Sequence, residues 1–236
     1  MTDIVKTAAY AASKSLGPYG SGIKRSHLSE VLAAMLGYRT FSALAMEEKD
    51  SELEFHLDDA ELLVLNQAMA EQRALELRIS SLREAMQACL GALMAAAESK
   101  SIAVYVGAED FWNSYARPRL ASAISSSREV MSAMSETNAD FNDDPELQDW
   151  MPSLADLWTA TDMWSISAEA RMEGEHDFRN ELDFMGDTLE CDAELFFEKA
   201  GRAGLRFAHS RCGATVDDSW HLEGFYDEED ETELGL

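Results

Sequence analysis

Four residues of the types that bind zinc lie in the last fifth of the chain: Cys191, His209, Cys212 and His221. The spacing His209-x2-Cys212 resembles one half of a zinc site. Cys191, however, falls on the apolar phase of an alternating segment, and the sequence offers no second close pair of ligands. We therefore expect no metal and no other cofactor.

Other catalytic signatures are missing from the sequence. The segment Gly17–Gly22 is rich in glycine but lacks the Lys-Ser/Thr pair of a phosphate-binding loop. Neither a dinucleotide fingerprint nor a nucleophile elbow occurs. We predict a non-enzymatic protein without catalytic residues, and an enzyme with an unmarked site is kept as an alternative.

Cations gather near the N-terminus, around a predicted pair of helices. Ser26 can cap a helix that ends at Gly37, where a helix C-terminus favours a positive φ angle. Thr40 can cap the next helix. With residues 3–16 these helices predict a three-helix module over residues 1–48. Its basic edge, a candidate partner-binding surface, consists of Lys24, Arg25, His27 and Arg39.

The segment 24–44 resembles a short helical module that heads bacterial proteins of plasmids, phages and other mobile elements. The resemblance rests on Ser26-His27, on Leu28, Leu32 and Ala33, on Leu36-Gly37-Tyr38, and on Phe41 and Leu44. The module is often called "glyoxalase-related" because it also occurs fused to glyoxalase-type domains. The resemblance implies a bacterial or mobile-element origin, but it does not indicate any particular activity. The chain has five histidines and too short a predicted sheet for a glyoxalase-type metal site.

Net charge separates this basic head from the rest of the chain. The protein has 19 Lys and Arg against 45 Asp and Glu, for a formal charge of −26. Residues 1–46 carry five basic and two acidic residues, whereas residues 140–236 carry six basic and 27 acidic ones. Such an acidic body repels phosphate backbones. We therefore expect the protein to bind or inhibit a basic protein partner that handles nucleic acid, and we expect no direct nucleic-acid binding by the body. The alternative is a DNA-linked regulator or antitoxin that uses the N-terminal module.

Two segments alternate apolar and polar residues with the period of a half-buried strand. They are Trp164–Met172 and Leu189–Phe197. Their polar phases place Glu169, Arg171 and Glu173 on one face and Glu190, Asp192 and Glu194 on another. These acidic rows are candidate partner-binding residues that could mimic nucleic acid. The alternative is that they only solvate the sheet.

Aromatic residues form a second candidate surface near residue 150. Trp150, Trp158 and Trp164 occur together with Met151 and Met163. Trp and Met favour protein interfaces. Packing between helical and sheet parts is the alternative, and Trp150 and Trp158 are kept as candidate partner-binding residues.

The elements that would position these residues predict an α+β fold. We expect a helical region over residues 58–137, a small antiparallel β-rich domain over 146–226, and a disordered acidic tail over 227–236. The turn-rich segment 138–145 is the expected main boundary. Within the helical region, Asp58 or Asp59 is expected to cap a long helix or helical hairpin that reaches Lys100.

Smaller predictions complete this scheme. An apolar seam from Leu75 to Ala97 has coiled-coil spacing and predicts a homo-oligomer formed through this helix. Residues 102–106 fit a short strand or further helix, residues 119–136 fit a helix, and residues 150–158 fit a short helix. The segment 220–226 is a further strand candidate.

Composition places the protein among globular chains, with 46% hydrophobic residues. No apolar run approaches the roughly 20 residues that span a bilayer. The first residues lack the apolar centre of a secretion signal, and three cysteines do not form a disulfide framework. We expect a cytoplasmic protein with no membrane contact.

Overall fold

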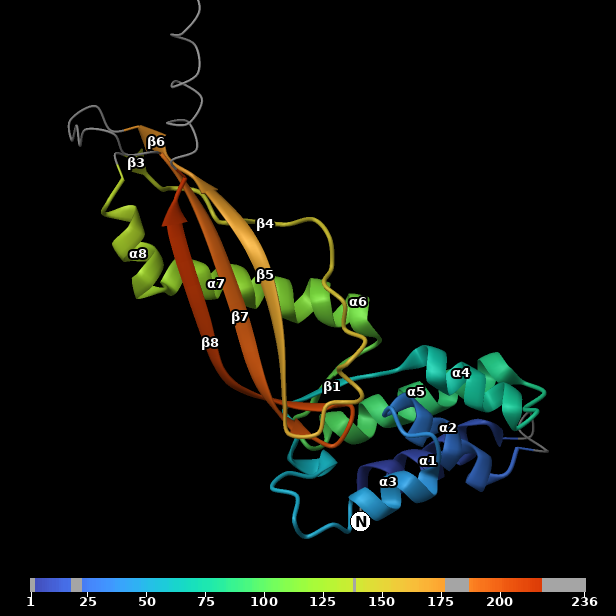
Figure 1. The fold of residues 1–236 in the computed structure, drawn as a ribbon. Coiled ribbons are helices and arrows are strands. Elements are labelled where there is room, and N and C mark those ends of the chain that lie inside the picture. The colour runs from blue at the N-terminus through green and yellow to red at the C-terminus, as the bar shows by residue number, and fades with distance from the viewer. Residues whose placement is uncertain (1–2, 18–22, 138, 177–186, 218–236) are drawn as a thin grey trace, which may run out of the picture. The chain divides into compact units, whose positions relative to one another are not determined.

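A computed structural model describes residues 3–17, 23–137, 139–176 and 187–217 (Figure 1). The fold is mixed α+β, as the sequence predicts. The chain divides into two compact units. Unit 1 contains Met1–Ala116, Met151–Ile166 and Leu195–His209, and unit 2 contains Arg117–Trp150, Ser167–Glu194 and Ser210–Leu236. None of the helices in the described ranges has the length and hydropathy needed to cross a membrane.

Unit 1 holds most of the helices. They are α1 (Asp3–Ser15), α2 (Arg25–Met35), α3 (Phe41–Glu47), α4 (Gln67–Glu76), α5 (Leu82–Glu98) and α6 (Ala108–Phe111), with the 3-10 helix η2 (Leu57–Asp59) and the π-helix η3 (Trp112–Ala116). Helix α2 packs against α1, α4 and α5. The stretch Val31–Leu36 is at most 2% exposed. The C-terminal half of this helix is therefore buried on all sides, as its continuous apolar run Val31–Leu36 requires, whereas Arg25 and Ser26 at its start are exposed.

Two of the three predicted signals at the ends of α2 and α3 are confirmed. The predicted Ser26 cap is wrong, because α2 begins at Arg25, with Lys24 at its N-cap and no side-chain hydrogen bond there. Gly37 follows α2 with a φ angle of 83°, and the Thr40 hydroxyl accepts a hydrogen bond from the Ala43 N–H at 3.1 Å. A Cβ atom at Gly37 would lie 3.0 Å from the Trp158 ring, so both the backbone angle and the space favour glycine.

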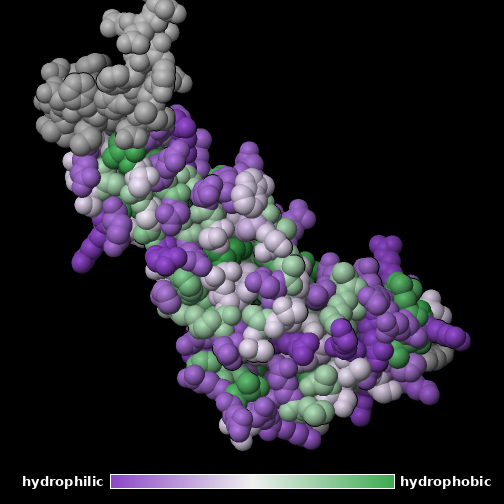
Figure 2. All heavy atoms as spheres, viewed as in Figure 1, coloured by the Kyte–Doolittle hydropathy of each residue, from purple (hydrophilic) through white to green (hydrophobic). Residues whose placement is uncertain are grey.

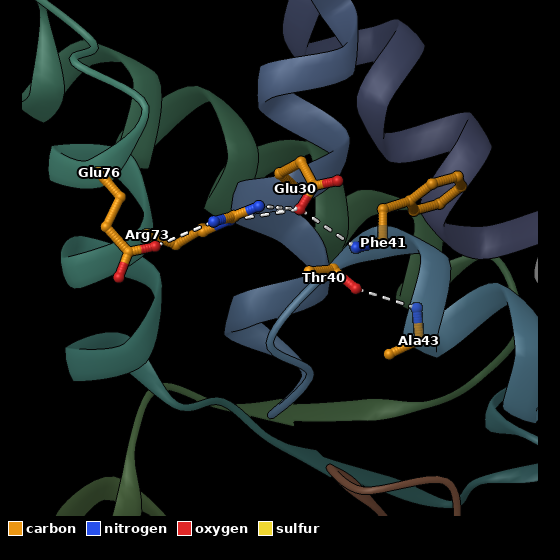
Figure 3. A network of polar contacts seen from close by, with 6 residues as sticks. All are labelled: Glu30, Thr40, Phe41, Ala43, Arg73 and Glu76. Atoms are coloured by element: carbon orange, nitrogen blue, oxygen red, sulfur yellow. Dashed lines mark hydrogen bonds and ion pairs between the residues drawn. The ribbon is translucent and has the colours of Figure 1, made fainter.

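An ion-pair network ties these helices to α4 (Figure 3). Arg73 of α4 contacts Glu30 of α2 at 2.7 Å and Glu76 of its own helix at 2.9 Å. Glu30 also accepts the Phe41 N–H at 3.3 Å. The hydrogen bond to Glu30 raises the pKa of Arg73. Helices α1–α3 thus share one core with α4 and α5, and the structure does not separate residues 1–48 as a module of their own.

The predicted helix starting at Asp58 or Asp59 is wrong in its first part. After η2 the chain forms a strand, β1 (Leu62–Val64), before α4 begins. The later part divides into α4 and α5, which contact each other, so the hairpin alternative describes it better than one rod. The apolar run at 62–65 is short and fully buried, and periodicity alone cannot distinguish such a strand from a helix.

The predicted seam for self-association is used within unit 1. Cys89, Leu93 and Ala97 are fully buried, and α5 packs against α1 and α2. Leu75, the first seam residue, lies on α4 rather than α5, and it is 64% exposed. The packing therefore gives no support to an oligomer formed through residues 75–97.

The main sheet has the strand order β2-β1-β8-β7-β5-β4. Its members after β1 are β2 (Ala103–Tyr105), β4 (Glu146–Leu147), β5 (Met163–Glu173), β7 (Thr188–Ala200) and β8 (Gly204–Val216). Strand β1 pairs parallel to β2 and antiparallel to β8, and β4 pairs antiparallel to β5. The two predicted strands are thus confirmed as β5 and β7, and each of the three long strands has residues in both units.

Unit 2 adds two helices and a second, two-stranded sheet. The helices are α7 (Arg117–Ser126) and α8 (Arg128–Met134), and the small sheet pairs β3 (Ala139–Asp140) with β6 (Glu175–His176). The helix predicted over 119–136 is therefore present but interrupted at Ser127, whose hydroxyl accepts the Val130 N–H and caps α8.

Three other predictions have different outcomes. Residues 150–158 contain turns and no helix, so the short helix predicted there is wrong. The segment predicted as a linker, 138–145, lies inside unit 2 and contributes β3. The strand candidate 220–226 and the acidic tail 227–236 fall outside the described residues. The two units interleave along the chain, whereas the predicted ranges follow one another.

Candidate functional site

Unit 2 presents one sheet face to its helices and leaves the other open. Along β5 and β7 the apolar phase is buried, as at Ala168, Met172 and Ala193. Helix α7 contacts β4 and passes behind β5, β7 and β8 in Figure 1, where α8 is drawn beside β8. The opposite phase of the strands carries Glu169, Arg171, Glu173, Glu190, Asp192 and Glu194, as the alternation predicts. We call the open side, together with Glu146 of β4, the acidic face.

The pairing of β5 with β7 is fixed by two backbone hydrogen bonds. Gly174 donates to Asp187 at 2.8 Å, and Lys199 donates to Asp162 at 2.9 Å. Both bonds belong to one antiparallel register. An uninterrupted ladder between them sets Glu169 opposite Asp192 and Arg171 opposite Glu190. The first of these is a non-hydrogen-bonded pair, in which opposite side chains lie closest together.

Neighbouring strands extend these rows. Glu146 pairs with Arg171, so a row of alternating sign runs from Glu146 through Arg171 to Glu190. Arg211 of β8 contacts Glu194 at 2.8 Å and continues another row. Between them, Glu169 and Asp192 face each other, and within the described ranges neither carboxylate forms an ion pair with a cationic side chain.

A shallow groove of about 420 Å³ crosses the acidic face. Its lining includes the carboxylates of Glu146, Glu169, Glu190 and Asp192, with Arg171 as its cation, and also Gln148. Among the residues that the structure describes, none donates a hydrogen bond to the buried oxygen Oε1 of Gln148. Hydrogen-bond acceptors therefore dominate the groove, which suits a ligand rich in N–H donors and positive charge. Figure 2 shows hydrophilic residues over much of the visible surface, with hydrophobic residues in smaller patches.

Unit 1 contains a second polar site, beside a cavity of about 460 Å³. The buried Tyr38 hydroxyl donates to Glu47 at 2.6 Å and accepts the Arg202 N–H at 3.1 Å. The Arg202 side chain lies 3.5 Å from Glu47 and over the Tyr38 ring. Burial, reinforced by Glu47, raises the pKa of Tyr38 well above its ordinary value. This phenol therefore stays protonated as a structural donor.

Lys199 lies in the wall of the same cavity and is only 4% exposed. Its Nζ donates to the carbonyl oxygens of Leu157 at 2.8 Å and Arg202 at 2.7 Å. Burial lowers the pKa of Lys199 to about 7, against the opposing influence of Glu47 and Asp156. A neutral amine has two N–H groups, and the two carbonyls use both. The observed role of Lys199 is thus to join the 154–158 turns to the turn between β7 and β8.

The four predicted N-terminal cations do not form one edge. Lys24, Arg25 and His27 lie at the start of α2, whereas Arg39 follows its end. An 11-residue helix is about 16 Å long, so Arg39 is well separated from the other three. The buried stretch of α2 between them cannot enter a groove of DNA without unfolding the core.

The predicted aromatic cluster is divided. Trp164 is buried and packs against Phe197, and the Trp158 indole donates to the Val64 carbonyl at 2.8 Å. Both belong to unit 1, where they serve packing. Trp150 belongs to unit 2 and is 61% exposed, so it alone of the three offers a large exposed aromatic surface.

The candidate zinc ligands have other surroundings. Cys191 is buried on the helix-covered face, where burial raises its pKa to about 11, and His209 stacks on Phe196. His221 lies outside the described residues. Among the residues that are described, no group of three or more His, Cys, Asp or Glu side chains could hold a metal ion.

Several residues of these sites were not predicted from the sequence. Lys199 continues the inward phase of β7 two residues after Phe197, and this alternation was a usable signal. Neither the Tyr38 hydroxyl nor Glu47 carries a local sequence signal for their hydrogen bond. No sequence signal shows Gln148 or the approach of Asp192 to Gly213, because both depend on pairing between distant strands.

Comparisons with protein-family models, with curated proteins and with solved structures found no match for this chain. The resemblance of residues 24–44 to the glyoxalase-related module therefore remains a prediction.

Proposed function

We propose that this protein is a non-enzymatic binding protein that holds a basic segment of a protein partner on the acidic face of unit 2. The supporting observation is the groove in which Glu146, Glu169, Glu190 and Asp192 surround one arginine. A partner that handles nucleic acid would carry such a basic surface. Origin from a bacterial mobile element is part of the proposal and rests on the N-terminal resemblance.

The electrostatics of the groove favour a cationic occupant. Like charges directly opposite on a sheet destabilise it by a few tenths of a kcal/mol to about 1 kcal/mol. A guanidinium or ammonium group between Glu169 and Asp192 would remove this repulsion and could donate to Gln148 Oε1. Arginine fits best, because its planar group donates to two carboxylates at once.

A defined basic probe tests the proposal without knowledge of the natural partner. Binding of an octa-arginine peptide to the full chain is measured by calorimetry at low and moderate salt. We expect Glu169→Gln with Glu190→Gln to weaken binding at least about tenfold, since two desolvated charge contacts are lost. Higher salt should weaken wild-type binding.

The matched control changes the same number of charges elsewhere. Glu84 and Glu98 are exposed carboxylates on α5, and Glu84→Gln with Glu98→Gln alters net charge by the same amount. This control should bind like wild type. If both double variants bound the peptide equally weakly, the peptide would be attracted by the overall charge of the protein. If both bound it like wild type, the groove would not be its binding site.

The alternative, a DNA-linked regulator or antitoxin, has less support because α2 is buried and the basic residues lie at its two ends. An electrophoretic shift assay with the full chain tests it directly. A shift that disappears in Lys24→Ala with Arg25→Ala would favour this function over the acidic-face proposal.

A further inference from the structure

In unit 2, no strand among the described residues pairs with the outer edge of β8. Its neighbours in the sheet are β7 on one side and β1 on the other, but β1 pairs only with Gly204 and Leu205. In the described ranges no strand accompanies the outer side of β8 over residues 210–216, and none is drawn beside this part in Figure 1. An unpaired edge of this length is a template for another strand.

The direction of the free backbone groups follows from the bond between β8 and β7. Asp217 donates to the Thr188 carbonyl at 2.9 Å, so Asp217 and every second residue before it face β7. The Arg211–Glu194 ion pair and the closeness of Gly213 to Asp192 agree with this register. The groups that point outward therefore belong to Ser210, Cys212, Ala214 and Val216.

The composition of β8 suits pairing with itself. Strands β5 and β7 both carry acids, whereas Gly204–Val216 contains two arginines and no Asp or Glu. Two antiparallel copies of β8 would thus bring no carboxylates together along the new ladder. In a dimer with two-fold symmetry, both copies contribute the same surface. The two β8 edges would therefore pair with each other, and neither would be left without a partner strand.

One register brings Arg211 of each copy close to a carboxylate of the other copy. With Cys212 on the two-fold axis, Arg211 lies opposite Gly213 of the second copy. A Cβ atom at Gly213 would lie 2.5 Å from Asp192 Oδ1, so the Asp192 carboxylate rests directly above this glycine. Sliding the strands until Arg211 is on the axis would instead set the two guanidinium groups against each other.

We propose that two copies of this chain form a symmetric dimer through antiparallel pairing of their β8 edges, with Arg211 of each copy reaching over Gly213 to Asp192 of the other. Arg211 is long, and its side chain is 72% exposed beside Glu194. A guanidinium group has five N–H donors, so it can bond Glu194 of its own chain and Asp192 of the second copy together. This inference does not depend on the proposed partner.

The test measures the mass of the full chain by light scattering and sedimentation at micromolar concentration. Wild type should be a dimer, and Arg211→Glu should raise the dissociation constant at least tenfold. The control is Arg206→Glu, on the same strand but before the paired segment. Arg206 also has its own ion pair, with Glu198 at 3.6 Å, and lies over the Phe55 ring, so each variant breaks an ion pair and changes the charge by the same amount. Arg206→Glu should remain dimeric.

A backbone variant tests the edge itself. Ala214→Pro removes an outward N–H that the β7 ladder does not use, so the sheet is kept and the dimer is lost. Ala214→Ser keeps the N–H and should stay dimeric. Hydrogen exchange provides a further measurement: the amides of Ser210, Cys212 and Ala214 should be protected in wild type and exchange rapidly in Arg211→Glu.

Three results would overturn the proposal. They are a monomeric wild type, equal effects of Arg211→Glu and Arg206→Glu, and a folded Ala214→Pro variant that is still dimeric. A monomer whose outward amides are protected would mean that a segment of the same chain covers the edge. If Ala214→Pro fails to fold, the comparison of Arg211→Glu with Arg206→Glu and the hydrogen-exchange measurement test the proposal.

Discussion

The two units place their charged side chains in opposite surroundings. In unit 1, Lys199 is buried with two carbonyl acceptors, and Glu47 has both the Tyr38 hydroxyl and Arg202 as partners. In unit 2, Glu169 and Asp192 lie opposite each other on an open face, and their groove contains a single arginine. The first arrangement gives its polar groups partners within the fold, and the second leaves two facing carboxylates without a cationic partner among the described residues.

This difference separates structure from binding. A partnered buried charge holds a fold in one arrangement, because removal of one partner leaves the other without compensation. An exposed pair of like charges contributes nothing favourable to folding, so it can change with little effect on stability. We therefore expect substitutions in unit 1 to alter the free energy of unfolding, and substitutions in unit 2 to alter binding.

The largest expected effect concerns Lys199 and pH. Its pKa in the folded protein, about 7, is below the ordinary value of 10.5, so the unfolded chain binds more protons between these two pH values. The free energy of unfolding of wild type should therefore rise with pH through this window, by up to about 1.4 kcal/mol per pH unit from this residue. Lys199→Met should remove this rise. Urea unfolding at several pH values from 7 upward measures it.

The control for this prediction is Lys49→Met, because Lys49 is exposed in the same unit. The difference in unfolding free energy between wild type and Lys49→Met should not vary over the window. If the unfolding free energies of wild type and Lys199→Met changed with pH in the same way, Lys199 would have its ordinary pKa in the folded protein. The strongest evidence for a difference between the two units would then be absent.

A smaller loss is expected from the Tyr38 hydroxyl. Tyr38→Phe keeps the ring but removes the donor to Glu47 and the acceptor of the Arg202 N–H. Unsatisfied buried groups of this kind cost about 1–3 kcal/mol, and urea unfolding at neutral pH should show a loss in this range. Tyr10→Phe is the control, since Tyr10 is 54% exposed. If the two variants are equally stable, the Tyr38 network is not a structural one.

The sequence predicted local features better than pairings. Alternation identified β5 and β7 and the open phase with Glu190 and Asp192, because a strand exposes every second side chain. Gly37 and Thr40 were identified because cap positions have specific backbone requirements. These signals need only neighbouring residues.

The features that were missed depend on residues far apart in the chain. Strand β1 is too short for a period, and its identity as a strand comes from pairing with β2 and β8. The division of the seam after Leu75 depends on how α4 and α5 pack. The contact of Asp192 with Gly213 requires the register between β7 and β8, which alternation within one strand does not specify.

The smallest expected effect compares the same substitution in both units. Glu169→Gln removes one of two facing carboxylates, so unfolding free energy should stay the same or rise by up to about 0.5 kcal/mol at low salt. Glu47→Gln loses the charge that faces Arg202 and should be destabilised by about 1 kcal/mol. Salt should diminish any gain of Glu169→Gln, because the repulsion between exposed charges is screened. Destabilisation by Glu169→Gln as large as that of Glu47→Gln would mean that the Glu169 carboxylate supports the sheet, and the acidic face would then need no partner to explain its charge.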